Sequence, residues 1–208
     1  MKKLESSLLN MVLVLTSVAV IMGGILALVN HLTEGPISHQ KAKALADGIK
    51  TVLACNDLMV SATDTVKQYD AKGKELVYII YQIKDAKGND LGVAVESTTG
   101  GFGGDLKVLV GFNPEGKILG YTLLEHSETP GLGAKADKWF QKGEKGDIIG
   151  KSPAEPLIVS KDGGQVDAIT ASTITSRAFL LAVNNAYNAY KATPSMDAQT
   201  GATQQVKK

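Results

Sequence analysis

The chain reads Gly164-Gln165-Val166-Asp167-Ala168-Ile169-Thr170-Ala171-Ser172-Thr173-Ile174-Thr175-Ser176-Arg177 before its last long apolar segment. That segment carries apolar residues at helical spacing, namely Ala178-Phe179-Leu180-Leu181-Ala182-Val183, Ala186, Tyr187 and Tyr190. The hydroxyl side chains of the quoted stretch therefore fall at the N-terminus of a predicted helix. Free backbone N–H groups and the positive end of the helix dipole make such a terminus favourable for an anion such as a phosphate. Ordinary helix capping by serine or threonine is the alternative interpretation.

The order of residues in this stretch matches a known sequence motif. Asp167-Ala168-Ile169-Thr170-Ala171-Ser172-Thr173 resembles the flavinylation motif of the FMN-binding domain family. In that family the last threonine carries FMN through a phosphoester bond, which a separate flavin transferase makes from FAD. The resemblance implies that Thr173 is the attachment residue, within a cofactor site that includes Asp167, Thr170, Ala171, Ser172 and Thr175. The chain departs from the commonest motif, with Ala171 where glycine is frequent and Ser172 where alanine is frequent.

A second motif lies about 40 residues earlier and reads Glu125-His126-Ser127-Glu128-Thr129-Pro130-Gly131-Leu132-Gly133-Ala134-Lys135. The serine has no recognisable nucleophile elbow, and one histidine with two carboxylates is a poor metal site, so we assign no catalytic side chain and no metal ligand. The run resembles the Glu-Ser/Thr-Pro-Gly-Leu-Gly segment of the same family. The resemblance implies flavin contacts from Glu128, Thr129, Gly131, Leu132 and Gly133, with the glycines allowing close approach of the backbone.

A glycine-rich run, Thr99-Gly100-Gly101-Phe102-Gly103-Gly104-Asp105, precedes that motif. It lacks the Gly-Lys-Ser/Thr ending of a phosphate-binding P-loop and is followed by a predicted strand, which argues against nucleotide hydrolysis. A plain glycine-rich connection is one interpretation. A similar glycine-aromatic-glycine run in the FMN-binding family makes it a candidate wall of the flavin pocket.

Composition limits the function classes. Lys and Arg number 22 against 21 Asp and Glu, so the net charge of +1 gives no argument for a nucleic-acid partner. Cys55 is the single cysteine, which excludes an internal disulfide and a cysteine-based zinc or iron–sulfur site in one copy of the chain. A chain of 208 residues is expected to form one domain with accessory segments.

The N-terminal part contains an uncharged apolar run from Leu8 to Val29. As a helix it would be about 33 Å long, enough to cross the hydrocarbon core of a bilayer. A cleaved signal peptide and a buried core helix are the alternatives, but the run is longer than a signal-peptide core and no good cleavage site follows it. Lys2 and Lys3 favour a cytoplasmic N-terminus and an extracytoplasmic domain.

The remaining pattern predicts alternating elements. Thr33 to Pro36 is expected to break the first helix, and a second helix is expected over 37–53. Strands are predicted over 75–83, 91–96, 106–112 and 117–124, while 56–70 is ambiguous. A helix is predicted over 136–142, a short strand over 157–159, and a final helix that ends near Lys191.

The predicted fold is therefore an α+β or α/β FMN-binding domain with one N-terminal transmembrane helix. Its parts are a cytoplasmic N-terminus (1–7), the transmembrane helix (8–30), the extracytoplasmic FMN-binding domain (31–192) and a disordered tail (193–208), whose composition is too polar to fold. The anchor and both motifs together resemble the G subunits of Rnf-type electron transport complexes.

That resemblance implies a flavoprotein subunit of an ion-translocating ferredoxin:NAD oxidoreductase in the bacterial inner (cytoplasmic) membrane. Its flavin domain would lie on the periplasmic side, its partners would be the other membrane subunits and a flavin transferase, and it would carry electrons without being a catalyst alone. The C subunit of the sodium-translocating NADH:quinone reductase shares the same features and is the alternative. A membrane-tethered binding module that is never flavinylated is another.

Overall fold

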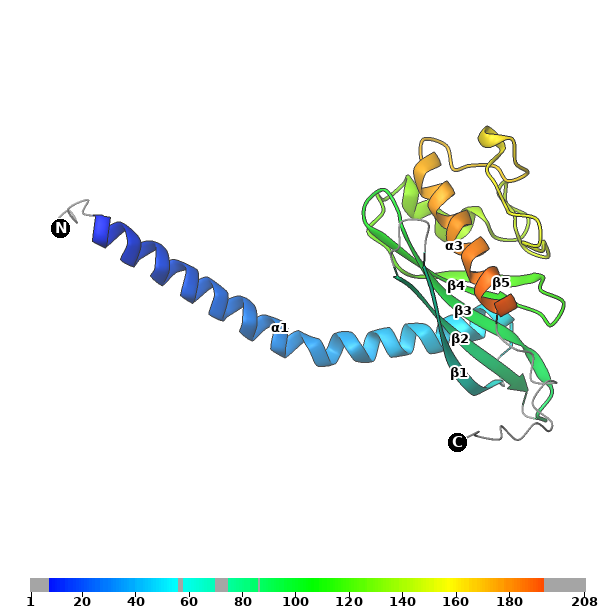
Figure 1. The fold of residues 1–208 in the computed structure, drawn as a ribbon, viewed down its shortest axis with the longest axis horizontal. Coiled ribbons are helices and arrows are strands. Elements are labelled where there is room, and N and C mark those ends of the chain that lie inside the picture. Colours follow the sequence, from blue (N-terminus) through cyan, green and yellow to red (C-terminus); the bar gives the residue numbers. More distant parts are fainter. Residues whose placement is uncertain (1–7, 56–57, 70–74, 86, 193–208) are drawn as a thin grey trace, which may run out of the picture. The chain divides into compact units, whose positions relative to one another are not determined.

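The computed structural model describes residues 8–55, 58–69, 75–85 and 87–192 (Figure 1). The chain divides into two compact units, Met1–Ala44 and Leu45–Lys208. The second unit holds the sheet, both motifs and the C-terminal helix. The predicted cytoplasmic segment 1–7 and the predicted disordered tail 193–208 lie outside the described residues.

The first helix, α1, runs without interruption over Leu8–Leu53, with Pro36 inside it. The predicted break at 33–36 and the separate helix over 37–53 are therefore wrong. Pro36 has no N–H to donate to the carbonyl of Leu32, so the helix loses one backbone hydrogen bond there. The long helical flanks on both sides tolerate that loss, and the helix continues through the proline.

The N-terminal part of α1 has the length and apolar composition needed to cross a membrane. Its large apolar side chains are exposed within the described chain; Leu8 and Leu15, for example, are 83% and 75% exposed. Such exposure over many consecutive residues would be unfavourable in water, so it agrees with the apolar run that predicted a membrane span.

The sheet contains five antiparallel strands in the order β1-β2-β3-β4-β5. The strands are β1 (Leu58–Tyr69), β2 (Glu75–Asp85), β3 (Asp90–Gly100), β4 (Asp105–Phe112) and β5 (Ile118–Glu125). Four of them correspond to predicted strands. The fifth, β1, fills the segment that the sequence left ambiguous, because it is an edge strand with a register shift between Val60 and Ala62 that interrupts the alternating pattern.

Each face of the sheet is covered by a helix. Figure 1 shows α3 (Thr173–Ala192) lying across one face, where Phe179 and Val183 pack with Val108 and Tyr121 in the main core. The last turns of α1 pack on the other face, through Ile49 and Val52 in a second cluster with Leu109 and Ala94. The partners Gly111 and Gly120 let the backbone of Val52 lie directly on β4 and β5, since a Cβ at either glycine would be within 3 Å of the Val52 carbonyl oxygen.

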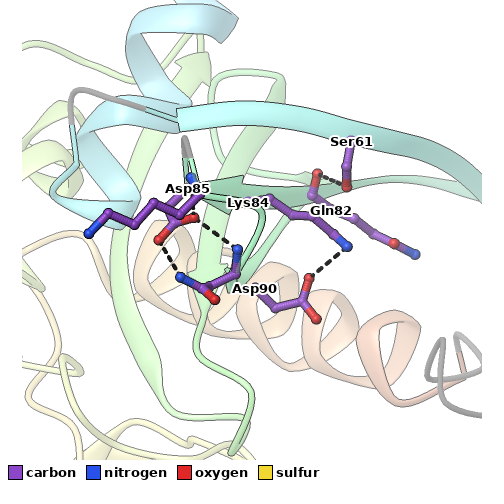
Figure 2. Close-up of polar contacts among 7 residues, drawn as sticks. Ser61, Gln82, Lys84, Asp85 and Asp90 are labelled. Carbon is purple, nitrogen blue, oxygen red and sulfur yellow. Dashed lines mark hydrogen bonds and ion pairs between the residues drawn. The ribbon is translucent and has the colours of Figure 1, made fainter.

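The connection between β2 and β3 is a turn held by one carboxylate (Figure 2). Asp85 accepts hydrogen bonds from the side-chain amide of Asn89 at 2.8 Å and from the backbone N–H groups of Asn89 and Lys87 at 2.8 and 2.7 Å. These bonds, chiefly that of the Asn89 side chain, hold the pKa of Asp85 below its usual value. A backbone bond from Gly88 N–H to the Asp85 carbonyl at 3.0 Å closes the same turn.

Two shorter predictions need correction. The helix predicted over 136–142 is only a four-residue helix, α2 (Ala136–Trp139), which follows directly on a 3₁₀ turn, η1 (Gly133–Lys135). The strand predicted over 157–159 is only an isolated bridge between Val159 and Val166, followed by the 3₁₀ turn η2 (Ser160–Asp162). The segment has the alternating apolar pattern of a strand because Leu157 and Val159 are buried in the core. It does not pair with any strand of the described sheet.

Candidate functional site

The centre of the candidate site is the buried carboxylate of Glu128, whose residue is 6% exposed. Its Oε1 accepts hydrogen bonds from the backbone N–H groups of Phe102 at 2.7 Å and Gly103 at 3.2 Å. Its Oε2 accepts a hydrogen bond from Thr175 Oγ1 at 2.7 Å. One carboxylate therefore joins the glycine-rich run, the Pro-Gly-Leu-Gly segment and the first turn of α3, which are far apart in the sequence.

Three glycines around Glu128 have no room for a side chain. A Cβ at Gly101 would overlap Glu128 Oε1, a Cβ at Gly133 would overlap Glu128 Oε2 and approach Thr175 Oγ1 to 2.7 Å, and a Cβ at Gly103 would overlap the Ser127 carbonyl. The glycines are therefore required so that the three segments can meet. Gly131 differs, because a Cβ there would meet open space, but its φ of +76° is one that an L side chain rarely adopts.

The turn that enters α3 has one strained backbone position. Ala171 has a φ of 62°, in the left-handed region that favours glycine. The turn is closed by a bond from Ser172 N–H to the Ile169 carbonyl at 3.0 Å, and by Ser176 Oγ, which accepts from Ile169 N–H at 2.9 Å. The departure from the motif at Ala171 is thus a residue in a glycine-type conformation, held by bonds on both sides of it.

The hydroxyl groups of this turn have different surroundings. Thr175 is 1% exposed and its hydroxyl is bonded to Glu128, while Thr170 is exposed. Thr173, the first residue of α3, is partly exposed. The predicted attachment residue is therefore the threonine that combines a position at the helix N-terminus with access from outside.

Thr173 also meets a cation. Lys161 Nζ donates a hydrogen bond to Thr173 Oγ1 at 3.1 Å. The next residue, Asp162, accepts two bonds from Arg177 of α3, from Nε at 2.7 Å and from Nη2 at 2.6 Å. This two-point contact lowers the pKa of Asp162 and raises that of Arg177, because each charge stabilises the other.

Asp167 connects the same turn to its surroundings. Its Oδ1 accepts a hydrogen bond from Ser160 Oγ at 3.0 Å, and its carbonyl accepts one from Trp139 Nε1 at 2.8 Å. The motif aspartate therefore holds η2 beside the entrance to α3. Thr129 is exposed, and its carbonyl accepts bonds from Leu132 and Ala134 N–H at 3.1 and 3.2 Å, which shape the glycine turn.

Apolar side chains around the site point outward instead of into the core. Phe102, Leu132 and Ile174 are 68%, 40% and 54% exposed, and each adjoins a residue that takes part in the contacts of Glu128. Exposed apolar residues grouped on three converging segments are typical of a surface that receives a flat apolar ligand or a partner.

The structure thus brings both predicted motifs together, and it adds residues that the sequence analysis did not select. These are Lys161, Asp162 and Arg177, whereas Phe102 belongs to the glycine-rich run that was a candidate wall of the flavin pocket. The sequence from Lys161 to Gly164 is typical of a turn, and nothing in its spacing shows which residue Lys161 would contact. Arg177 could have been selected from the sequence, because it lies one helical turn after Thr173 and so on the same face of α3.

The chain is similar to several known proteins. Residues 101–188 match the FMN-binding domain family. The chain is 33% identical to the G subunit of the ion-translocating oxidoreductase complex of Shewanella baltica, over 81% of this chain and 82% of that protein. It is 38% identical to the protein of the same name from Yersinia pestis, over 78% and 80% of the two chains. It is also similar to a solved structure, Shewanella oneidensis NqrC, with 24% identity and a TM-score of 0.43 over 63% of this chain and 70% of that chain.

The described residues fit an FMN group. A hydroxyl at a helix N-terminus with an ammonium group beside it suits a phosphoryl group. Glycines that exclude any Cβ allow the backbone to approach closely, and the exposed apolar side chains offer contacts for a flat ring.

Proposed function

The chain belongs to the family of G subunits of ion-translocating oxidoreductase complexes, and on that premise we propose that it anchors a flavin to the membrane and relays electrons through FMN joined to Thr173 by a phosphoester. We assign the phosphoester to Thr173 because the three threonines of this turn have different surroundings. Thr175 uses its hydroxyl to hold Glu128, Thr170 lies outside the helix, and Thr173 presents a reachable hydroxyl at the first residue of α3. The relatives from Shewanella baltica and Yersinia pestis carry the G-subunit name, which favours this assignment over the C subunit of the NADH:quinone reductase.

Attachment would be a phosphoryl transfer from FAD, made by a separate flavin transferase. The bond that forms joins Thr173 Oγ1 to the phosphorus on the FMN side. The bond that breaks is the pyrophosphate P–O bond, AMP leaves, and the hydroxyl proton passes to a base of the transferase. The N-terminus of α3 stabilises the remaining negative charge of the ester.

The chemistry that FMN supplies when bound is the uptake and release of electrons, and the chain's own residues place and shield it. Glu128 fixes the glycine-rich run and the Pro-Gly-Leu-Gly segment against α3, so their backbones form one rigid surface. Phe102, Leu132 and Ile174 provide apolar contacts that exclude water from the ring. The covalent bond keeps the cofactor on the protein where no pool of free FMN would replace it.

This division of roles predicts that the subunit alone is not a dehydrogenase. The sequence contains neither a dinucleotide fingerprint nor a cysteine cluster for an iron–sulfur centre. We expect the flavinylated full-length chain in detergent to be reduced by dithionite and to show negligible NADH oxidation, measured by absorbance. Rapid NADH-dependent turnover by the isolated chain would point to a self-contained dehydrogenase and contradict the relay.

We also propose that the flavin domain lies on the periplasmic side of the cytoplasmic membrane, with residues 1–7 in the cytoplasm and the other membrane subunits of the complex as partners. The apolar stretch of α1 and the lysines Lys2 and Lys3 support this orientation. A reporter that is active only in the cytoplasm, fused to the C-terminus, is expected to be inactive. A matched fusion to a periplasm-specific reporter should be active, and the reverse pair of results would mean that the topology is inverted.

A further inference from the structure

The loop that precedes the flavinylation motif places one cation on the attachment residue. Lys161 belongs to η2 (Ser160–Asp162), and its Nζ donates to Thr173 Oγ1 at 3.1 Å. Within the part of the chain that the structure describes, no carboxylate forms an ion pair with Lys161. The ammonium group therefore keeps its charge available at the hydroxyl that the proposed function esterifies.

The position of Lys161 is set by contacts on both sides. Asp162 is fixed to Arg177 by the two bonds at 2.7 and 2.6 Å, and Ser160 is fixed to Asp167 by its hydroxyl and to Val166 by a backbone bond at 2.7 Å. Gly163 then turns the chain away in a left-handed conformation, with a φ of 85°. The backbone around Lys161 is thus tied to the turn that carries the motif.

Stability does not explain this lysine. A single exposed hydrogen bond between a lysine and a threonine contributes little to folding, because both groups are well hydrated in the unfolded chain. The Asp162–Arg177 pair next to it is already neutral as a pair, so Lys161 adds one unmatched positive charge at Thr173. A phosphodiester on Thr173 carries one negative charge, which this cation matches.

We propose that Lys161 is the cationic partner of the phosphoryl group on Thr173, both while the bond is made and afterwards. The proposal rests on the function proposed above. As the Thr173 Oγ1–phosphorus bond forms and AMP leaves FAD, negative charge is shared by the phosphoryl oxygens, and the Lys161 ammonium stabilises it by a charge-assisted hydrogen bond. In the loaded protein the same group offsets the charge of the phosphodiester.

The first test is the rate of flavinylation of the full-length chain by a flavin transferase with FAD, followed by intact mass. Lys161→Met is expected to load about tenfold more slowly, the effect of losing one hydrogen bond from a charged donor. Lys161→Arg should restore most of the rate, because it keeps the charge. The matched control is Lys117→Met, which lies far from the motif. Lys117 follows the turn whose carbonyls bind the hydroxyl of Tyr190. Tyr190 itself is about 25 Å from Thr173 along α3, at 1.5 Å per residue.

The second test separates a charge contact from a merely structural role. The ³¹P NMR shift of the fully loaded Lys161→Met protein should differ from that of wild type at the same pH, while Lys117→Met should overlay wild type. Thermal unfolding of the apo chains should be unchanged in every variant, since the lysine is exposed.

The outcomes are distinguishable. Slow loading and a shifted ³¹P signal in Lys161→Met alone support the proposal. Wild-type loading rate and an unshifted signal in Lys161→Met overturn it, while FMN on Thr173 of the wild type would leave the proposed function intact. A wild-type chain that accepts no FMN would overturn both.

Discussion

Replacing Thr173 by alanine is expected to abolish covalent flavin completely, because it removes the hydroxyl oxygen that we propose forms the phosphoester at the N-terminus of α3. Alanine is smaller, keeps a helical backbone and leaves the Glu128–Thr175 contact untouched, so the fold should remain. Intact mass after co-expression with a flavin transferase measures the effect. An FMN-sized adduct that survives on the Thr173→Ala protein would refute the attachment residue.

Two further variants sharpen that experiment. Thr173→Ser keeps the hydroxyl and loses only a methyl group, so it should still accept FMN to a measurable extent. Thr170→Ala is the matched control, since Thr170 is an exposed threonine of the same turn and its loss should at most reduce loading. Thr175→Ala is not a suitable control because its hydroxyl is buried on Glu128.

Replacing Glu128 by alanine is expected to lower the free energy of unfolding by about 2–3 kcal/mol, because it leaves the N–H groups of Phe102 and Gly103 and the hydroxyl of Thr175 without their acceptor. Flavinylation should fall as well, since the glycine-rich run is then no longer fixed to α3. Urea denaturation measures the first effect. Hydrogen exchange measures the release of the glycine-rich run, which should appear as faster exchange at the amides of Phe102 and Gly103.

Gly133→Ala tests the contact between Glu128 and Thr175 without changing either residue. Its Cβ would overlap Glu128 Oε2 and crowd Thr175 Oγ1, so it should also release the carboxylate and accelerate exchange at Phe102. Glu155→Ala, at an exposed glutamate, is the control and should behave as wild type. Wild-type exchange at Phe102 and Gly103 in Glu128→Ala would show that this carboxylate does not hold the loop.

Sequence reasoning identified the FMN-binding domain from two continuous motifs. The order from Asp167 to Thr173 and the run around Gly131 and Gly133 predicted the FMN-binding domain, which the family match confirms. The strands from β2 to β5 were equally readable, because each is a short apolar run rich in β-branched and aromatic residues.

The features that sequence reasoning missed depend on contacts between segments that are distant in the sequence. The contact of Glu128 with the flavin stays a prediction, and its oxygens are bonded to Phe102, Gly103 and Thr175, a pairing that no local pattern encodes. We therefore propose that it positions the loops. Lys161 was not selected, since its role follows from the η2 turn that the Asp162–Arg177 pair fixes. Pro36 predicted a break by its local preference, which a long continuous helix overrides.

Peptide mass spectrometry of the natively expressed chain tests the central claim most directly. Cleavage after Lys161 and Arg177 releases the peptide of residues 162–177, which contains every hydroxyl of the motif and no internal lysine or arginine. Fragmentation of that peptide is expected to place one FMN, less one water, on Thr173. An unmodified peptide from cells that contain an active flavin transferase, or FMN on another residue, would contradict it.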